Sequence, residues 1–235
     1  MNFNEVSFSQ LGDSAIIINF ENKIDETISS KVLHLFYKLK EKSFPFVKDI
    51  VPAYSSLAIF YDLLILNNKN TINKFSLKNI TDQIKILLEE NIKIPSLPSR
   101  KIKLPVCYSE KYGLDLKDIS IQKKLSPDEI IKLHTAKKYR VYMIGFLPGF
   151  AYMGEVDERI AISRKAQPRT IVEAGSEGIP GMQTGIYPLD SPGGWQIIGK
   201  TLMKIFDKEK DEPVLLQPGD EIEFYSITED EFTNY

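Results

Sequence analysis

The sequence predicts an α+β protein with two domains, an N-terminal two-layer ββαββα domain and a C-terminal closed β-barrel. Three features predict this: a change of composition near residue 100, the order of the segments before it, and the glycine and proline content after it. Ten of the 11 asparagines lie at or before Asn91, whereas all five arginines lie at or after Arg100. The Pro/Ser segment 94–99 cannot continue a helix, so we expect domains at 1–95 and 100–235.

The N-terminal half alternates pairs of strands with helices. Segment 5–20 is typical of two strands around a turn at 11–14, and segment 46–61 is typical of a second pair. Between them, residues 24–39 have helical spacing, with Asp25 as a plausible N-cap. We expect His34, inside this helix, to be at the surface or half-buried. A second amphipathic helix is predicted, with four apolar side chains that face the core: Ile80, Ile84, Leu87 and Leu88.

The C-terminal half begins with a strand at 101–108, in which Cys107 is expected to be a core residue. No helix N-terminus or cation is evident beside Cys107 to lower its pKa. Ser126 and Glu129 then predict a capping box that starts a helix ending near 136–138. After residue 139 no helical period remains, and the short strands and turns predict a closed barrel ending in a strand at 221–225.

The composition excludes several classes of protein. The chain has 235 residues, 43% of them hydrophobic, and a formal net charge of -2, which argues against a dedicated nucleic-acid binder. One cysteine and two histidines exclude an internal disulfide, a cysteine-cluster metal site and a multi-histidine metal centre, so no metal site is expected. Neither a signal peptide nor an apolar run long enough for a membrane span is evident, so we expect a cytoplasmic protein.

Glycine and proline concentrate in one quarter of the chain. Ten of the 13 glycines and five of the 13 prolines lie between Gly145 and Gly199, interleaved with aromatic residues. This mixture favours a concave surface with an apolar floor, although core packing explains Tyr187 and Trp195 equally well. The predicted groove residues are Phe146, Pro148, Gly149, Phe150, Gly185, Tyr187, Ser191, Pro192, Gly193, Gly194 and Trp195.

Residues 194–201, GWQIIGKT, match the P-loop pattern letter for letter. A P-loop must wrap tightly around phosphate, yet Trp195, Ile197 and Ile198 are bulky and typical of a strand. The motif also requires a preceding strand and a following helix, whereas 191–193 is typical of a turn and 202–206 alternates like a strand. We therefore expect no P-loop, while ATP binding through other contacts stays open.

His134 is the candidate imidazole nearest the glycine-rich segment. It stands at a helix end five residues before Tyr139, where it is placed to face the groove and to handle a proton or a phosphate. The structural alternative is a histidine that caps the helix C-terminus. Arg140, Arg164 and Arg169 are candidates to pair with a carboxylate or phosphate, and surface salt bridges are the alternative for each.

Several motifs together resemble one known family. They are Gly145–Tyr152, Pro168-Arg169-Thr170, Ala174-Gly175-Ser176, Gln183–Pro188 and Ser191–Trp195 followed by Gly199. They resemble the family of the 5-oxoprolinase B subunit, which also contains the kinase A inhibitor KipI and was long labelled allophanate hydrolase subunit 1. The resemblance implies that the barrel is cyclophilin-like. The sequence departs from the family pattern at Tyr108–Leu116 and at Met182.

The resemblance implies an enzyme subunit that is inactive without its partners. It would open 5-oxo-L-proline to L-glutamate with ATP, and with Mg²⁺ as the accompanying ion, together with the A and C subunits of 5-oxoprolinase. The implied catalytic residues are His134 for proton or phosphate handling, Arg169 for a carboxylate or phosphate, and Gln183 for contacts in the groove. The alternative is a KipI-like regulator that binds a sensor histidine kinase and blocks its autophosphorylation. Prolyl isomerase activity would follow from the barrel fold alone, and a fold does not carry a function.

Overall fold

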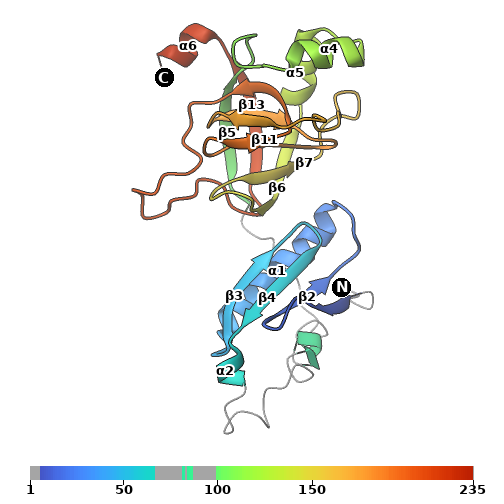
Figure 1. The fold of residues 1–235 in the computed structure, drawn as a ribbon, viewed down its shortest axis with the longest axis vertical. Helices are drawn as coiled ribbons and strands as arrows, with labels where there is room; N and C mark the ends of the chain where they lie inside the picture. The colour runs from blue at the N-terminus through green and yellow to red at the C-terminus, as the bar shows by residue number, and fades with distance from the viewer. Residues whose placement is uncertain (1–5, 67–80, 83, 87–98, 235) are drawn as a thin grey trace. The chain divides into compact units, whose positions relative to one another are not determined.

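The computed structural model describes residues 6–66, 81–82, 84–86 and 99–234. The chain divides into two compact units, residues 1–98 and 99–235, which we describe one at a time (Figure 1). The N-terminal unit contains β1 (Ser7–Gln10), β2 (Ala15–Asn19), α1 (Glu26–Lys42), β3 (Val47–Pro52), β4 (Ser56–Tyr61) and α2 (Leu63–Leu66).

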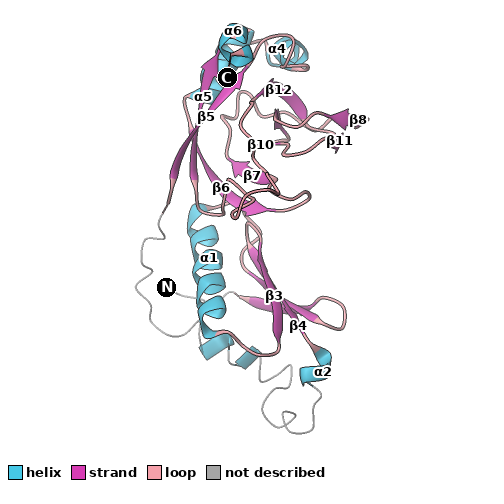
Figure 2. Cartoon of the chain, turned by 90° about the vertical axis from the view of Figure 1, so that its left-hand side faces the viewer, coloured by secondary structure: helices cyan, strands magenta, loops and turns pink. Residues whose placement is uncertain are grey.

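The N-terminal unit is a two-layer structure, as predicted. Its four strands form an antiparallel sheet in the order β1-β2-β4-β3, and α1 lies along one face of that sheet (Figure 2). The carboxylate of Asp25 accepts hydrogen bonds from the backbone N–H groups of Thr27 and Ile28, which caps the helix. The apolar side of α1 packs on the alternating inward residues of β2 and β4, and this contact forms the core of the unit.

His34 and the second helix of this unit were each the subject of a prediction. His34 is 9% exposed, which is more buried than expected, because it lies next to Leu33 and Leu35 on the packed side of α1. Residues 81–82 and 84–86 are helical and Ile84 is buried, in line with the predicted second helix. Its other predicted core positions, 80, 87 and 88, lie outside the described residues.

The C-terminal unit is a closed barrel, as predicted, with the strand order β10-β7-β6-β13-β5-β12-β9 and β9 pairing back to β10. Its strands are β5 (Lys101–Cys107), β6 (Lys138–Ile144), β7 (Ala151–Gly154), β9 (Ser176–Ile179), β10 (Gln183–Ile186), β12 (Gln196–Lys200) and β13 (Glu221–Ile227). The neighbours pair antiparallel except β13 and β5, which run parallel. Two further strands, β8 (Arg169–Val172) and β11 (Ser191–Gly193), pair with each other outside the barrel.

Three helices accompany the barrel. They are α4 (Leu116–Lys123), α5 (Pro127–Thr135) and α6 (Glu229–Thr233). The predicted capping box is present at the start of α5, where Ser126 and Glu129 bond each other's backbone and side chain. Two of these three helices were not predicted. Helix α4 buries only Leu116 and Ile119, and α6 follows a second capping box, formed by Thr228 and Glu231.

The segment that matches the P-loop pattern is not a phosphate loop. Residues 196–200 form β12, whose backbone pairs with β9 and β5 inside the barrel wall. Residues 202–206 alternate like a strand in the sequence, but the structure forms no strand there. The segment contributes only an isolated bridge between Phe206 and Val214. Cys107 is buried in β5, as expected for a core cysteine. In the described part of the chain, no helix combines the length and apolarity needed to cross a membrane.

Candidate functional site

The predicted aromatic floor of the groove is a packed cluster. Phe150 and Tyr187 are both nearly fully buried, with ring centroids 5.1 Å apart, and the rings of Phe150 and Trp195 are 5.0 Å apart. Edge-to-face contacts of this kind stabilise a core. The core-packing alternative therefore describes Phe150, Tyr187 and Trp195 in this structure.

Two predicted groove glycines serve this packing. A Cβ atom on Gly193 would collide with the ring and hydroxyl of Tyr187, and one on Gly185 would collide with the carbonyl oxygen of Ala151 and the ring of Trp195. Glycine is therefore required at both positions by the close approach of neighbouring atoms. The concentration of glycine reflects how tightly this part of the barrel is packed.

The remaining predicted groove residues scatter around this cluster. Phe146 lies in the β6–β7 loop with a positive φ of 71° and 64% of its side chain exposed. In the same loop Pro148 is exposed and Gly149 is buried with φ at +82°. In or beside β11, Ser191 is buried, Pro192 is exposed and Gly194 is half-buried, and Gln183 is half-buried in β10. The structure does not gather these residues around the imidazole of His134.

His134 lies inside the barrel. Its side chain is 0% exposed, and its ring stacks against those of Tyr139 and Phe224, at centroid distances of 5.2 and 5.0 Å. Burial lowers its pKa to about 3, so the imidazole is neutral at pH 7. The expectation that His134 faces a groove is therefore wrong for this structure, because the last turn of α5 places the ring among buried side chains of β6, β10 and β13.

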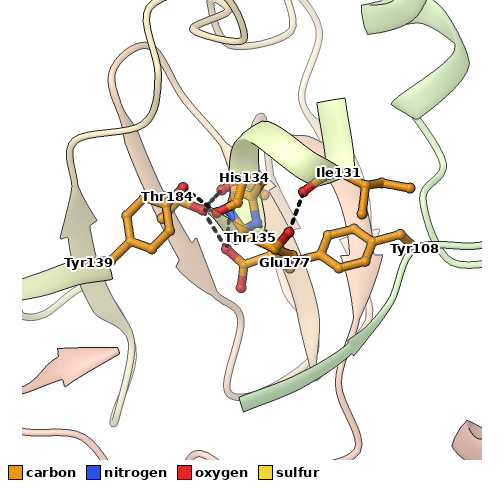
Figure 3. Close-up of polar contacts among 8 residues, drawn as sticks. Tyr108, Ile131, His134, Thr135, Tyr139, Glu177 and Thr184 are labelled. Atoms are coloured by element: carbon orange, nitrogen blue, oxygen red, sulfur yellow. Dashed lines mark hydrogen bonds and ion pairs between the residues drawn. The ribbon is translucent and has the colours of Figure 1, made fainter. Parts of the chain in front are cut away.

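His134 takes part in a buried hydrogen-bond network with three other side chains (Figure 3). Its Nδ1 lies 2.9 Å from the hydroxyl of Tyr108, and its Nε2 lies 3.0 Å from Oγ1 of Thr184. Thr184 also forms a very short hydrogen bond with Oε1 of Glu177, which is itself 0% exposed. Since the hydroxyl of Thr184 is engaged as a donor elsewhere, Nε2 carries the hydrogen and Nδ1 accepts from Tyr108.

Glu177 is neutral in this environment. Burial raises its pKa to about 8, although hydrogen bonds that the ionised carboxylate would accept from the Thr184 hydroxyl and the Gly185 amide act in the opposite direction. The oxygen of Thr184 also lies 3.1 Å from the carbonyl oxygen of Gly178, which can only accept. With Glu177 protonated, its O–H donates to Thr184 and the Thr184 hydroxyl is free to donate to Gly178. The neutral form therefore satisfies every contact of Thr184 at once.

An ion pair between His134 and Glu177 is disfavoured. Nε2 and Oε1 are 3.7 Å apart, and the Thr184 hydroxyl bonds to both of them. If both groups were charged, each would lose its hydration, because neither is exposed to water. The electrostatic attraction between charges 3.7 Å apart would offset only part of that free-energy cost. The network is thus a chain of neutral hydrogen bonds in the barrel core.

A second polar cluster is centred on Asp115, a residue that the sequence analysis did not single out. Arg169 donates two hydrogen bonds to its carboxylate, at 2.8 and 2.7 Å, and Nζ of Lys165 donates a third at 2.7 Å. The backbone N–H of Ile197 donates a fourth at 2.7 Å. Asp115 is 1% exposed; burial alone would raise its pKa, but these four donors hold it below its usual value.

This cluster fixes the position of Arg169. Its guanidinium is bound to a carboxylate, as the sequence suggested, but to that of Asp115 in the same chain. The bidentate bond orients Arg169 and leaves the triad of Asp115, Lys165 and Arg169 with one excess positive charge.

A cleft of about 720 Å³ lies beside this cluster. Its wall is formed by α4, by residues 161–167 and by Gln196 of β12. The polar side chains that line it are Asp118, Gln122, Lys123, Ser163, Arg164, Lys165, Gln167 and Gln196. In the described part of the chain, no group of three or more His, Cys, Asp or Glu side chains is arranged to hold a metal ion.

Comparisons with known proteins identify the family. A family model described as carboxyltransferase domain, subdomain C and D, matches residues 6–216. The 5-oxoprolinase B subunit of Bacillus subtilis (strain 168) is 37% identical over 96% of this chain and 95% of its own length. That of Escherichia coli O157:H7 is 34% identical over 91% of this chain and 93% of its own.

A solved structure agrees with these relatives. The crystal structure of TTHA0988 superposes with a TM-score of 0.76 and 32% sequence identity, over 91% of this chain and 40% of that longer one. The family-model match and the relatives extend over nearly the whole chain, across both compact units. The chain therefore belongs to the family of 5-oxoprolinase B subunits and carries the fold of carboxyltransferase subdomains C and D.

Proposed function

We propose that this chain is the B subunit of an ATP-dependent 5-oxoprolinase, which opens 5-oxo-L-proline to L-glutamate together with the A and C subunits. The observation that carries the proposal is the end-to-end similarity to a curated 5-oxoprolinase B subunit, at 37% identity over 96% of this chain. The match to TTHA0988, which covers only 40% of that chain, supports a working unit larger than this chain.

The chemistry explains why such a reaction uses ATP. The carbonyl carbon of a lactam is a poor electrophile because the ring nitrogen donates electrons to it. Transfer of the γ-phosphoryl group to the lactam oxygen, with ADP as the leaving group, would make the ring carbon more electrophilic. Water would then add to that carbon, the C–N bond would break with a proton passing to the nitrogen, and a second water would release phosphate from the acyl phosphate that results. ATP is the source of that phosphoryl group in the proposed function, with Mg²⁺ as its counter-ion.

The described residues do not provide a standard site for ATP and Mg²⁺. The segment 194–201 lies in and around β12, which pairs with β9 and β5 in the barrel wall, and the backbone N–H of Ile197 is bound to Asp115. No cluster of metal-binding side chains occurs in the ranges that the structure describes. We therefore assign ATP binding to the assembled complex of subunits and not to this chain alone.

His134 fits a positioning role in the proposed enzyme. Its ring is neutral and surrounded by Tyr139, Phe224 and Thr184, so it holds β10 and α5 against the barrel core. A group that contacts the lactam must be reachable from outside the barrel, which His134 is not. Arg169 and Gln183 remain candidates for contact with substrate, because each is partly exposed.

The experiment is glutamate release from 5-oxo-L-proline by this chain co-expressed with its A and C homologues, with and without ATP. We expect release that requires ATP and disappears when this chain is left out. A complex that assembles from all three chains but releases no glutamate would overturn the proposal. Co-purification of the chain with a sensor histidine kinase in place of a C-subunit homologue would favour the KipI-like alternative.

A further inference from the structure

The cleft beside α4 gathers positive charge in a protein whose net charge is -2. Lys123, Arg164 and Lys165 line it, and Asp118 is its one acidic lining residue. Among the residues that the structure describes, neither Lys123 nor Arg164 forms an ion pair with an acidic side chain. The charge of these two cations is thus available to a ligand.

Two cations of the cleft are held in place before any ligand binds. Nζ of Lys165 is fixed 2.7 Å from the buried carboxylate of Asp115, to which Arg169 is also bound. The guanidinium of Arg164 lies over the ring of Trp195, 5.9 Å from its centroid. Fixed donors lose less conformational entropy on binding than free ones, so they bind an anion more tightly.

Amide groups complete the lining. Gln122 and Gln167 lie at the cleft, and Gln196 does as well, with its Nε2 donating to the carbonyl oxygen of Ser163 at 3.1 Å. Amides hydrogen-bond a neutral N–H or C=O group, while the cations bind a carboxylate or phosphate. The volume lies within the range of pockets that bind small molecules.

We propose that this cleft binds a small molecule through an anionic group, which Lys165, Arg164 and Lys123 recognise, and that the group is the carboxylate of the substrate. Naming the substrate as 5-oxo-L-proline rests on the proposed function. Its carboxylate suits the three cations, and its lactam N–H and C=O suit the glutamine amides. Phosphate presents the same negative charge, so the experiment must distinguish the two.

The test is a binding titration of the full chain alone, followed by the fluorescence of Trp195, the single tryptophan. The guanidinium of Arg164 lies over its ring, so an anion that binds Arg164 changes the charge beside the indole and with it the emission. The probes are 5-oxo-L-proline, 2-pyrrolidinone, which is the same lactam without a carboxylate, and inorganic phosphate, all at one ionic strength. We expect saturation with 5-oxo-L-proline and none with 2-pyrrolidinone.

Variants locate the binding site. Arg164→Gln and Lys123→Gln each remove a charge-assisted contact at the protein surface, and each is expected to weaken binding about tenfold or more. The effect of Lys123→Gln is read by fluorescence, and that of Arg164→Gln by calorimetry, because this variant alters the reporter. Lys117→Gln removes the same charge from α4 outside the cleft and is expected to leave the affinity unchanged.

Each other outcome contradicts the proposal in a defined way. Saturation by phosphate but not by 5-oxo-L-proline would overturn the substrate carboxylate as the ligand. Equal weakening by Lys117→Gln, or no saturation with any probe, would overturn the cleft as an anion site. In the assembled complex, glutamate release with an unchanged KM in Arg164→Gln would refute the cleft while leaving the proposed function intact.

Discussion

Replacement of Glu177 by glutamine tests whether the barrel core holds a neutral carboxyl group. Burial raises the pKa of Glu177 from 4.5 to about 8, so between these values the folded chain keeps a proton that the unfolded chain releases. The contribution of Glu177 to the free energy of unfolding is therefore fully present below pH 4.5 and is lost as the pH rises to 8. At 1.36 kcal/mol per pH unit, the full loss is about 5 kcal/mol.

His134 has the opposite effect at lower pH. Burial lowers its pKa from 6.5 to about 3, so its contribution is complete above pH 6.5 and is lost as the pH falls toward 3. The two slopes cancel between pH 4.5 and 6.5. From pH 6.5 to 8 only Glu177 acts, and we expect the wild-type barrel to lose about 2 kcal/mol over that interval.

The measurement is urea unfolding at pH 6.5, 7.25 and 8, followed by the fluorescence of Trp195, which is buried in the barrel unit and reports on it alone. Glu177→Gln keeps the shape and the donor of the neutral carboxyl but cannot ionise. Its stability relative to wild type should rise by about 2 kcal/mol between pH 6.5 and 8. The exposed Glu158 supplies the matched control, Glu158→Gln, whose difference from wild type should stay constant. A constant difference for Glu177→Gln as well would refute the neutral assignment.

Three substitutions and one matched control test ion pairing, packing and helix capping in the barrel unit by the same unfolding assay. Asp115→Asn should cost about 3 kcal/mol, because two partly buried cationic donors lose the buried charge that they share; a loss below about 1 kcal/mol would contradict this. Gly193→Ala should cost about 1–3 kcal/mol through collision with Tyr187, whereas Gly145→Ala, which meets only a flexible methionine end at 3.6 Å, should cost less than about 1 kcal/mol. Ser126→Ala should cost about 1 kcal/mol by removing one half of the capping box, and an unchanged midpoint would show that the cap does not stabilise the barrel unit.

The elements that the sequence predicted well carry their signals locally. The N-cap at Asp25 and the capping box at Ser126 are read within four residues, and both helices start where expected. Helix α4, whose N-cap is Asp115, was not predicted, because it buries only two apolar residues and so gives a weak helical pattern. The carboxylate of Asp115 makes no cap hydrogen bond, since Arg169 and Lys165 occupy it. That arrangement depends on tertiary contacts and cannot be read from the local sequence.

The candidate site was predictable in its residue types but not in its pairings. Arg169 was expected to pair with a carboxylate or phosphate, or to form a surface salt bridge. The partner that the structure shows is the buried carboxylate of Asp115, 54 residues earlier in the chain. Glu177 and Thr184 lie 43 and 50 residues after His134, and they meet it only because the barrel closes. The spacing of residues along one sequence does not report the register of strands that close a barrel.

The polar cluster around His134 and the polar cluster around Asp115 are suited to different roles. The inner cluster around His134 is neutral and sealed, so it stabilises the barrel and cannot exchange a proton with a bound substrate. The outer cluster around Asp115 supports a cleft rich in cations, which suits binding and orientation of an anion. Of the cleft's lining side chains, Asp118 is the single carboxylate and none is a histidine or cysteine, so the cleft offers few groups for general base or nucleophilic chemistry. Such a division explains why a chain of this family is expected to need partner subunits for turnover, and it predicts that binding of 5-oxo-L-proline and its hydrolysis can be separated by assaying this chain with and without them.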